Sequence, residues 1–449
     1  MKRVLFSTLG MTDPMKNDYD GPLLHILRHY MPGKVYLFMT KRICELADID
    51  NRYRIYIQRL SEKIGFDCEV VELRYEEIDN PQQFDIFYPL FEKELTKIHQ
   101  MNPECQILIN LSSGTPQMKS ACQLISLTTP FPVHSIQVTT PHERENYGPI
   151  NFDLEHTWEN NLDNHPELEI KNRCVEVESK NLRYLFLREA ALSHIKAYEY
   201  GAALSVLSTV KEFIPVSVLN LLQAAWHRKN MELIKATQLA EASGFDLFPV
   251  KSANVLEIFE YLLLLKLQQQ KGDLLSFVRG ISPALTRLFE ALLQEKCRRK
   301  IKVRYCVEFG KRGSDHWKLL REKLASDKDL LSHYDSEFNG NFRDSDLSAA
   351  ALLPMITYDF GPKGLRDSVV VERAVKMREV EEQLRNPAAH SIRAITEEQF
   401  MEKTGISSRK LMDYLIWMFE YTYPKYIPQG ENPWESYEKM NNEIISRLK

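Results

Sequence analysis

An arginine, an asparagine and a histidine lie within six residues near the carboxyl end of the 449-residue chain, as Arg385, Asn386 and His390. Histidine can take up or release a proton near neutral pH, and arginine can hold a phosphate through two hydrogen bonds. These groups suit the cleavage of RNA by its own 2′-hydroxyl, which needs proton transfer and phosphate stabilisation but no metal ion. The three residues are therefore candidate catalytic residues of a ribonuclease.

The spacing of Arg385 and His390 is also compatible with a structural role. In a chain with 12 histidines, about one such pair with arginine is expected by chance. Arg188 and His194 form a similar pair, one residue wider, on an ordinary helical stretch. An arginine and a histidine that cap and pack a helix end are the alternative to catalysis.

The residues around this motif predict its local structure. Apolar residues at helical spacing precede it: Val370, Ala374, Met377, Val380 and Leu384. Because proline inside a helix clashes with the carbonyl four residues earlier, we expect this helix to end near Arg385. Asn386 would then cap a second helix whose first position is Pro387. Arg385 and His390 are thereby predicted to meet at a helix junction, beside free N–H groups that attract phosphate.

The amino-terminal part of the chain alternates strand-like and helix-like stretches. Strands are predicted over residues 4–8, 34–40, 68–73, 106–110 and 133–139, with helices over 20–30, 53–64, 84–100 and 117–126. This alternation is typical of an α/β domain with a parallel, doubly wound, Rossmann-like sheet. Ligands of such sheets bind beyond the carboxyl ends of the strands.

Two loops at these strand ends carry candidate binding residues. One loop covers residues 7–14 after the first strand, and the other covers residues 111–117 after the fourth. Hydroxyls and one glycine make up the second loop: Ser112, Ser113, Gly114 and Thr115. A helix begins directly after it, so this loop can cradle phosphate or ribose oxygens. A strand-to-helix turn capped by serine or threonine is the structural alternative.

Other common ligand and catalytic motifs are missing from the sequence. It contains neither Gly-x-Gly-x-x-Gly nor a P-loop, which argues against a dinucleotide cofactor and against ATP hydrolysis. It also lacks the Gly-x-Ser-x-Gly elbow of many serine hydrolases. The second loop is therefore a candidate site for a nucleotide of another kind.

The composition is that of an ordinary globular protein of two or three domains, with 44% hydrophobic and 27% charged residues. The formal net charge of −4 predicts no global attraction to nucleic acid, so any RNA contact has to use a local basic surface. Seven cysteines without a Cys-x-x-Cys pair argue against zinc sites and disulfides, and favour the cytoplasm. No apolar run reaches about 18 residues, so no membrane segment is predicted.

The rest of the chain predicts an all-α structure. Residues 141–180 are polar and predict an exposed connection between domains. Helices are then expected over residues 182–198, 202–213, 216–229, 231–243 and 255–270, and a further helical bundle from residue 283. The densest basic run opens this bundle: Lys296, Arg298, Arg299, Lys300, Lys302 and Arg304. It could line an RNA groove, or it could be a solvated helix face or an interdomain contact.

The two loops and the carboxyl-terminal motif together resemble one known family. Residues 7–14 read STLGMTDP, residues 20–26 read DGPLLHI, residues 110–116 read NLSSGTP and residues 385–390 read RNPAAH. These stretches resemble the CARF–HEPN ribonucleases of type III-A CRISPR systems. The resemblance implies a CARF sensor domain over residues 1–150, a helical linker domain over 151–275 and a HEPN ribonuclease domain over 276–449.

The resemblance also implies a function. Proteins of this family are endoribonucleases that degrade single-stranded RNA in antiviral defence, without a metal ion or other cofactor, when a cyclic oligoadenylate binds the sensor. They are homodimers whose two HEPN motifs face each other in one active site. His390 would transfer a proton to or from the 2′-hydroxyl or the leaving 5′-oxygen, Arg385 would stabilise the transition state, and Asn386 would orient the junction or the phosphate. The expected products are a 2′,3′-cyclic phosphate and a 5′-hydroxyl.

By the same resemblance, the activator lies across the sensor domains of the dimer. Its expected contacts are Thr12, Asp13, Ser112, Ser113, Gly114, Thr115 and Gln117, with His134 at the start of the last strand as a further candidate that could equally be structural. Cyclic hexa-adenylate is the expected ring. Some family sensors slowly cut their own ligand, and Thr115 is the candidate residue for such self-limiting cleavage.

Two other functions fit the same residues. The protein could be a regulatory scaffold that senses a nucleotide and acts on a partner, although the intact Arg385, Asn386 and His390 argue against a decayed motif. It could also be a toxin-like HEPN nuclease that responds to another nucleotide. A transcription factor fits less well, because the isoelectric point is near 6.3 and no clear helix-turn-helix is present.

Overall fold

The computed structural model describes residues 2–16, 18–140, 153–165, 171–309, 316–362, 364–390, 394–428 and 430–449, and the side chains of residues 385–390 lie outside this description. The chain divides into two compact units, Met1–Leu185 and Phe186–Lys449. None of the described helices is both long and apolar enough to cross a membrane.

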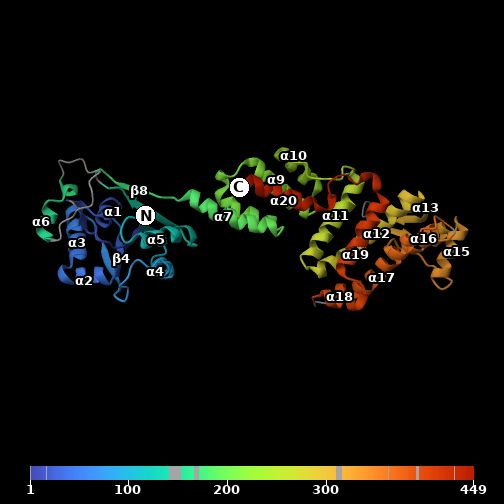
Figure 1. Cartoon of the computed structure of the whole chain (residues 1–449), viewed down its shortest axis with the longest axis horizontal. Helices are drawn as coiled ribbons and strands as arrows, with labels where there is room; N and C mark the ends of the chain where they lie inside the picture. Colours follow the sequence, from blue (N-terminus) through green and yellow to red (C-terminus); the bar gives the residue numbers. More distant parts are fainter. Residues whose placement is uncertain are drawn as a thin grey trace. The chain divides into compact units, whose positions relative to one another are not determined.

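The first unit is built around a six-stranded sheet with the strand order β5–β4–β1–β6–β7–β8 (Figure 1). Its parallel strands are β1 (Arg3–Thr8), β4 (Lys34–Thr40), β5 (Glu69–Tyr75), β6 (Gln106–Asn110) and β7 (Val133–Val138). These bounds agree with the predicted strands to within two residues, so the α/β prediction is confirmed. The strand order reverses between β1 and β6, and such a reversal opens a crevice at the carboxyl ends of the two strands.

Helices cover both faces of this sheet. They are α1 (Pro22–Tyr30), α2 (Lys41–Asp50), α3 (Arg52–Ile64), α4 (Phe87–Met101) and α5 (Pro116–Thr128). Successive residues of a strand point to opposite faces, so Leu5 packs in the core under α1 to α3, whereas Phe6 packs in the core under α4 and α5. Both side chains are fully buried. The sheet therefore holds its strand ends, and the loops that follow them, on a rigid two-sided core.

The predicted exposed connection over residues 141–180 is only partly correct for the described residues: most are exposed or half-buried, but some form regular elements of the sheet domain and two are buried. Residues of this stretch form α6 (Leu154–Glu159), the short helix η1 (Leu162–Asn164) and β8 (Cys174–Glu176), which pairs antiparallel with β7. Asn161 is fully buried and Asp163 is 6% exposed. Polar residues such as these predict exposure from the sequence. They are buried here because they form hydrogen bonds with buried polar groups of the sheet domain.

The second unit is almost entirely helical. Its helices are α7 (Lys180–Lys196), which begins in the first unit, α8 (Tyr200–Leu207), η2 (Ser208–Phe213), α9 (Val216–Lys229), α10 (Leu233–Ser243), α11 (Ala253–Gln270), α12 (Leu274–Cys297), α13 (Ile301–Tyr305), α14 (Arg321–Leu324), α15 (Lys328–Glu337), α16 (Ala349–Phe360), α17 (Ser368–His390), α18 (Glu397–Thr404), α19 (Ser408–Thr422), η3 (Pro424–Tyr426), η4 (Pro433–Glu435) and α20 (Ser436–Leu448). The predicted helical pattern is confirmed. A small sheet of β9 (Cys306–Glu308), β10 (Trp317–Leu319) and β11 (Ser345–Asp346) was not predicted.

Helix α17 carries the candidate catalytic motif at its end. The predicted apolar face is confirmed, since Val370, Ala374, Met377, Val380 and Leu384 are all buried. The predicted helix junction is wrong, because one helix continues through Pro387 to His390. Pro387 lies in the last turn, where its missing N–H removes one hydrogen bond, and the two alanines that follow favour helix. Arg385, Asn386 and His390 thus belong to the last two turns of a single helix.

Candidate functional site

The loops after β1 and β6 touch each other through two glycines. A Cβ atom at Gly10 would lie 2.9 Å from the backbone nitrogen of Gly114. A Cβ atom at Gly114 would lie 2.6 Å from Thr8 Oγ1, and Gly114 has a φ of +85°. Residues with side chains rarely adopt this backbone conformation. The contact between the two loops therefore requires glycine at both positions.

Buried polar groups at the ends of β1 and β6 fix the second loop. Thr8 Oγ1 donates a hydrogen bond to the carbonyl of Ser113 at 2.7 Å. Asn110 Nδ2 donates to Ser113 Oγ at 2.8 Å, and Asn110 Oδ1 accepts from the backbone N–H of Ser112 at 2.8 Å. Ser113 is 1% exposed, so its hydroxyl organises the interior of the loop.

The other two hydroxyls of this loop also hold neighbouring elements. Ser112 Oγ accepts from the backbone N–H of Val138 at the end of β7, at 2.7 Å. Thr115 is the N-cap of α5: its Oγ1 accepts from the N–H of Met118 at 3.3 Å and donates to the carbonyl of Pro81 at 2.9 Å. The loop is therefore a strand-to-helix turn capped by Thr115, as the structural alternative predicted. A phosphate site at the start of α5 is still compatible with this turn, because the start of the helix lies at the same edge of the sheet.

An open cavity of about 1620 Å³ lies at this edge of the sheet. Four of the predicted contact residues line it: Thr12, Ser112, Gly114 and Thr115. Four others are not among its lining residues: Asp13, Ser113, Gln117 and His134. The cavity thus joins both predicted loops at one site, as the topology of the sheet requires.

Asp13 is buried behind the first loop. Its carboxylate accepts hydrogen bonds from the backbone N–H of Gly10 at 3.2 Å and from the backbone N–H of Leu23 at 3.0 Å. Burial raises the pKa of this carboxyl to about 6, although the hydrogen bonds from the backbone oppose the shift. Asp13 therefore ties the loop to the start of α1.

His134 and Gln117 lie away from the cavity lining for different reasons. His134 is at the amino end of β7, whereas the cavity is at the carboxyl ends, and its Nδ1 forms a close contact with a carboxylate oxygen of Glu176. Gln117 is half-buried on the first turn of α5, and its Oε1 is buried with no hydrogen-bond partner among the described residues. A ligand could satisfy that atom only after the side chain turns toward the cavity.

The cavity lining includes four cations that were not predicted from the sequence: Lys16, Arg42, Lys119 and Arg173. Among the described lining residues the acidic ones are Asp18 and Asp20, so cations outnumber carboxylates in this part of the lining although the whole chain carries a net charge of −4. Lys119 follows the predicted loop by two residues, and Arg42 follows the end of β4. Both could have been predicted, because ligands of such sheets bind beyond the carboxyl ends of the strands. Nothing in the sequence pointed to Arg173.

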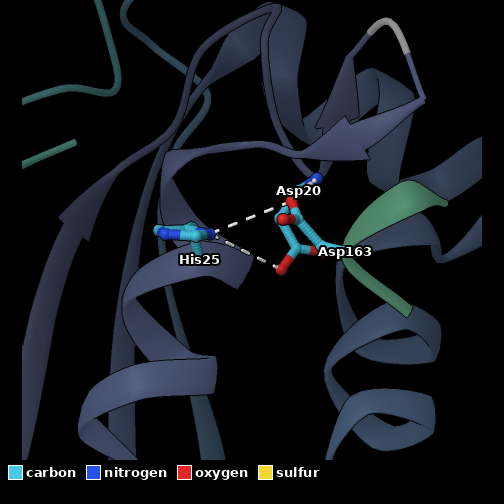
Figure 2. Close-up of side chains that lie close together, drawn as sticks. All are labelled: Asp20, His25 and Asp163. Carbon is cyan, nitrogen blue, oxygen red and sulfur yellow. Dashed lines mark hydrogen bonds and ion pairs between the residues drawn. The ribbon is translucent and has the colours of Figure 1, made fainter. Parts of the chain in front are cut away.

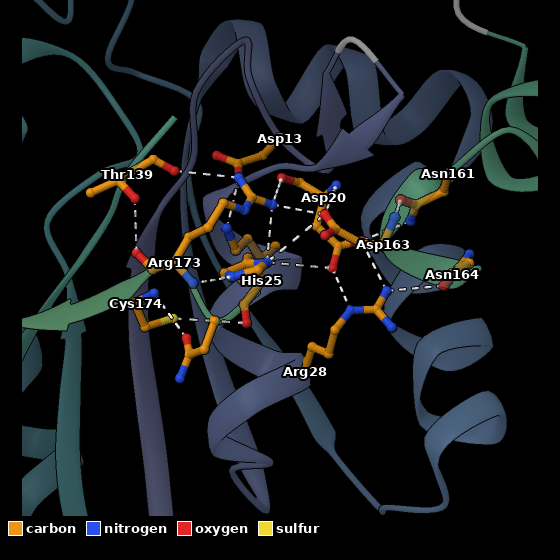
Figure 3. Close-up of polar contacts among 12 residues, drawn as sticks. Asp13, Asp20, His25, Arg28, Thr139, Asn161, Asp163, Asn164, Arg173 and Cys174 are labelled. Carbon is orange, nitrogen blue, oxygen red and sulfur yellow. Dashed lines mark hydrogen bonds and ion pairs between the residues drawn. The ribbon is translucent and has the colours of Figure 1, made fainter. Parts of the chain in front are cut away.

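Arg173 is held against the cavity by a buried network (Figure 3). Its Nη2 donates to Asp163 Oδ2 at 2.7 Å and to the carbonyl of Asp20 at 3.3 Å, and its guanidinium lies 5.7 Å from the ring of Tyr19. Asp163 comes from η1 and Asp20 from the β2–β3 hairpin, β2 (Met15–Lys16) and β3 (Tyr19–Asp20). The residues beyond position 150 thus complete the cavity of the first unit.

His25 faces the two carboxylates of this network, which lie next to each other (Figure 2). Its Nδ1 is 3.9 Å from the nearest oxygen of Asp20 and 3.9 Å from that of Asp163. Its Nε2 accepts from the backbone N–H of Arg173 at 3.0 Å, so this nitrogen carries no proton. Burial, reinforced by the charge of Arg173, lowers the pKa of His25 to about 2. The imidazole is therefore neutral at physiological pH.

Asp20, His25 and Asp163 could also offer three ligand atoms to a metal ion, since these atoms lie within 4.8 Å of one another. Both carboxylates, however, already have arginine partners. Arg28 donates to Asp20 at 2.6 Å and 3.0 Å, and Arg173 donates to Asp163 at 2.7 Å. Because a cation would have to compete with these buried ion pairs, we interpret the cluster as structural.

The candidate catalytic residues belong to the other unit. The side chains of Arg385, Asn386 and His390 lie outside the described residues, and the backbone places all three at the end of α17. Asn386 and His390 are four residues apart, which is about one turn of helix. The buried apolar face of α17 anchors this end of the helix to the core of the second unit.

Family models match most of the chain. Residues 67–174 match the Cas_Csm6 CARF domain, residues 177–229 the 6H domain of CRISPR-associated protein Csm6, and residues 247–445 the Cas_Csm6 HEPN domain. The CRISPR system endoribonuclease Csm6 of Mycobacterium tuberculosis is 30% identical over 452 residues, which cover 99% of this chain and 98% of that protein. The chain belongs to the Csm6 family. It is accordingly an endoribonuclease of CRISPR defence with CARF and HEPN domains.

Two further comparisons agree with this assignment. Csm6 of Enterococcus italicus is 26% identical over 298 residues, which cover 65% of this chain and 67% of that protein. A solved structure, Enterococcus italicus Csm6 bound to cyclic hexa-2′-fluoro-hexa-dAMP, matches over 100% of both chains with a TM-score of 0.70 and 21% identity. The likeness confirms that the chain has the Csm6 fold, with an α/β amino-terminal domain followed by helical domains. Membership of this family favours the nuclease over a regulatory scaffold.

Proposed function

We propose that this Csm6-family endoribonuclease is switched on by a cyclic oligoadenylate that binds the cavity between the loops after β1 and β6. One observation carries the proposal: this cavity joins both predicted loops to four cations, Lys16, Arg42, Lys119 and Arg173. A cyclic oligoadenylate carries one phosphate for each nucleoside, and arginine and lysine are the side chains that bind phosphate best. The ligand in the matching Enterococcus italicus structure supports the same class and favours a ring of six.

The substrate we propose is single-stranded RNA in type III CRISPR defence in the cytoplasm, cut without a metal ion. His390 would move the proton of the 2′-hydroxyl or of the leaving 5′-oxygen, and Arg385 would stabilise the charge that builds on the phosphate. Asn386 would orient the phosphate. Attack by the 2′-oxygen breaks the bond to the 5′-oxygen, so the products would be a 2′,3′-cyclic phosphate and a 5′-hydroxyl.

The proposed active form is a homodimer in which two HEPN motifs form one active site and the activator lies across two sensor domains. Binding in the cavity must then favour a dimer arrangement that brings the two α17 ends together, which makes activation a coupling between distant sites. The proposed domain limits are 1–150, 151–275 and 276–449; Arg173, beyond the first limit, lines the sensor cavity and is held there by Asp163.

Slow cleavage of the activator would make the enzyme self-limiting, and Thr115 is the residue we propose for it. Its hydroxyl lines the cavity but donates to the carbonyl of Pro81. For this hydroxyl to act on a ligand, that hydrogen bond has to be exchanged for one to the activator. Thr115→Val should therefore prolong the activated state if the activator is cut there, measured as RNA cleavage over time after a single addition of cyclic hexa-adenylate.

The test of the proposed activator is direct binding to the full-length protein. Isothermal titration with cyclic tetra-adenylate, cyclic hexa-adenylate and linear hexa-adenylate should give the tightest binding for one ring. Equal, weak binding of all three would show that the cavity takes another ligand.

A further inference from the structure

Helix α19 presents a stripe of aromatic side chains that the proposed function does not use. Tyr414, Trp417 and Tyr421 are spaced by three and four residues, so they lie on one face of the helix. All three are half-buried, and the rings of Trp417 and Tyr421 stack with their centroids 5.2 Å apart. The adjacent face of α19 forms the core through Leu411, Leu415, Met418 and Phe419, which are buried. The aromatic stripe is therefore not needed to bury that face.

Cations alternate with these rings. The guanidinium of Arg373, on α17, lies 4.1 Å from the ring of Trp417 and 5.3 Å from that of Tyr414. Lys410 lies 5.2 Å from the ring of Tyr414, and Lys296, on α12, lies 4.9 Å from the ring of Tyr421. We call these six residues the α19 ladder: Lys296, Arg373, Lys410, Tyr414, Trp417 and Tyr421.

The charges of the α19 ladder are not neutralised. Within the described part of the chain, Lys296, Arg373 and Lys410 contact aromatic faces and form no ion pair with a carboxylate. The basic run predicted from the sequence differs, since Arg299 is ion-paired with Asp359 and Asp327. Lys302 is likewise 3.2 Å from Glu290. Lys296 belongs to both sets, so the α19 ladder combines one cation of the densest basic run with Arg373 from α17 and Lys410 from α19.

The α19 ladder leads toward the candidate catalytic end of α17. The hydroxyl of Tyr421 donates to Asp367, just before α17 begins, at 2.9 Å, whereas Trp417 and Tyr414 meet Arg373 further along α17. The two helices thus run antiparallel, and α12 packs against both (Figure 1). From Tyr421 to Lys410 the ladder spans about 16 Å, at 1.5 Å for each helical residue.

We propose that the α19 ladder binds the single-stranded RNA substrate and guides it to the catalytic end of α17. The proposal rests on the endoribonuclease function and on the assignment of Arg385 and His390. Bases stack on aromatic faces whatever their sequence, and cations track the phosphates between them. The alternation of rings and unneutralised cations fits this polymer, which carries one base and one phosphate in each repeat.

The test is RNA cleavage by full-length protein at a saturating concentration of activator. Trp417→Ala with Tyr414→Ala should raise the KM for a fluorescent single-stranded RNA by about fivefold to a hundredfold, the range expected for the loss of a stacked base. The kcat and the half-maximal activator concentration should stay unchanged. Trp417→Phe, which keeps a ring, should restore most of the affinity. Trp226→Ala removes an exposed ring of the same residue type from α9 and should change nothing.

The charges are tested by salt dependence. Lys410→Ala changes an exposed residue, so the protein should fold even where the aromatic variants do not. For single-stranded RNA, each lost cation should lower the slope of log affinity against log salt by about 0.7. An unchanged slope together with an unchanged KM in the aromatic double variant would overturn the proposal.

Two other results are distinguishable. If the aromatic variants dissociate in sedimentation velocity while the wild type is a dimer, the α19 ladder is a surface between two copies of the chain and the RNA assignment is overturned. If the wild type cleaves no RNA with any cyclic oligoadenylate, the proposed activation fails. The RNA assignment can then still be decided by fluorescence anisotropy of labelled RNA on His390→Ala protein, with and without the Trp417 substitution.

Discussion

The cavity of the sheet domain is assembled from many separate stretches of chain, whereas the three candidate catalytic residues lie within six consecutive positions at the end of α17. The cavity depends on backbone packing, because Gly10 and Gly114 let two loops touch and Asp163 brings in Arg173 from a distant segment. The catalytic end depends on the chemistry of two or three side chains. Substitutions should therefore act differently at the two sites: through affinity for the activator at the cavity, and through the rate of cleavage at α17.

The largest effect is expected at the catalytic end. His390→Ala should lower RNA cleavage at saturating activator by about a hundredfold to ten-thousandfold, because it removes a proton-transfer group. Activator binding, measured by isothermal titration, should stay at the wild-type value. His194→Ala on α7 is the matched control and should cleave normally. Normal cleavage by His390→Ala would remove that residue from the mechanism.

The next effect is on the shape of the cavity. Gly114→Ala places a methyl group 2.6 Å from Thr8 Oγ1 at a φ of +85°, so the loop has to move. We expect the half-maximal activator concentration to rise by about a hundredfold, since strain and clash together cost a few kcal/mol. Gly33→Ala is the control, because nothing lies within 4 Å of a Cβ atom there. Equal activation of both variants would show that the loop contact does not shape the site.

A smaller effect is expected from the charge of the cavity. Lys119→Ala and Arg42→Ala each remove one cation from the lining, and each should raise the half-maximal activator concentration by about tenfold, the cost of one charge-assisted hydrogen bond. The maximal cleavage rate should not change. Lys93→Ala, on an exposed position of α4, is the control. A lowered maximal rate with unchanged activator affinity would mean that these residues transmit activation and do not bind the ligand.

The smallest effect concerns pH. The pKa of His25 is lowered from its ordinary value of 6.5 to about 2 in the folded protein, so its contribution to stability is complete above pH 6.5 and falls as the pH drops. The pKa of Asp13 is raised to about 6 in the folded protein. Its contribution to the free energy of unfolding therefore increases as the pH falls below 6, opposite to that of His25. The effect of His25 is therefore isolated by comparing the free energy of unfolding of the wild type with that of His25→Gln at each pH. Between pH 6.5 and 5 the free energy of unfolding of the wild type should fall, relative to that of the variant, by up to about 1.4 kcal/mol for each pH unit.

That difference can be measured by hydrogen exchange of peptides from α1 after correction for the intrinsic pH dependence of exchange. The same slope in both proteins would contradict a neutral, buried His25. Peptides from α11 in the second unit serve as the internal reference, because neither His25 nor Asp13 belongs to that unit.

The elements that were predicted correctly from the sequence are those defined by the pattern of neighbouring residues. Residues 107–109 are apolar, and a serine-rich loop and a helix follow soon after them, so both the strand and the loop could be predicted directly. The sequence could not predict β8, which is three residues long, or the burial of Asn161 and Asp163, which both pair with Asp20 from more than 140 positions away. Arg173 escaped notice for the same reason.

The end of α17 shows a different limit. Pro387 predicts a helix break, but this helix continues through the proline, which lies in the last turn and is followed by two alanines, and its buried apolar face anchors it. The motif itself was found from residue types alone. Its catalytic roles stay a prediction, since residue types define chemistry but not the distance between groups.

The most direct test of the account is the cleavage of a fluorescent single-stranded RNA in EDTA by the full-length protein, with and without cyclic tetra-adenylate and cyclic hexa-adenylate. The account predicts negligible cleavage without a ring and strong cleavage with one ring, the hexa-adenylate, at full rate in the chelator. Cleavage that ignores both rings, or that stops in EDTA, would contradict activation through the cavity or metal-independent chemistry at α17.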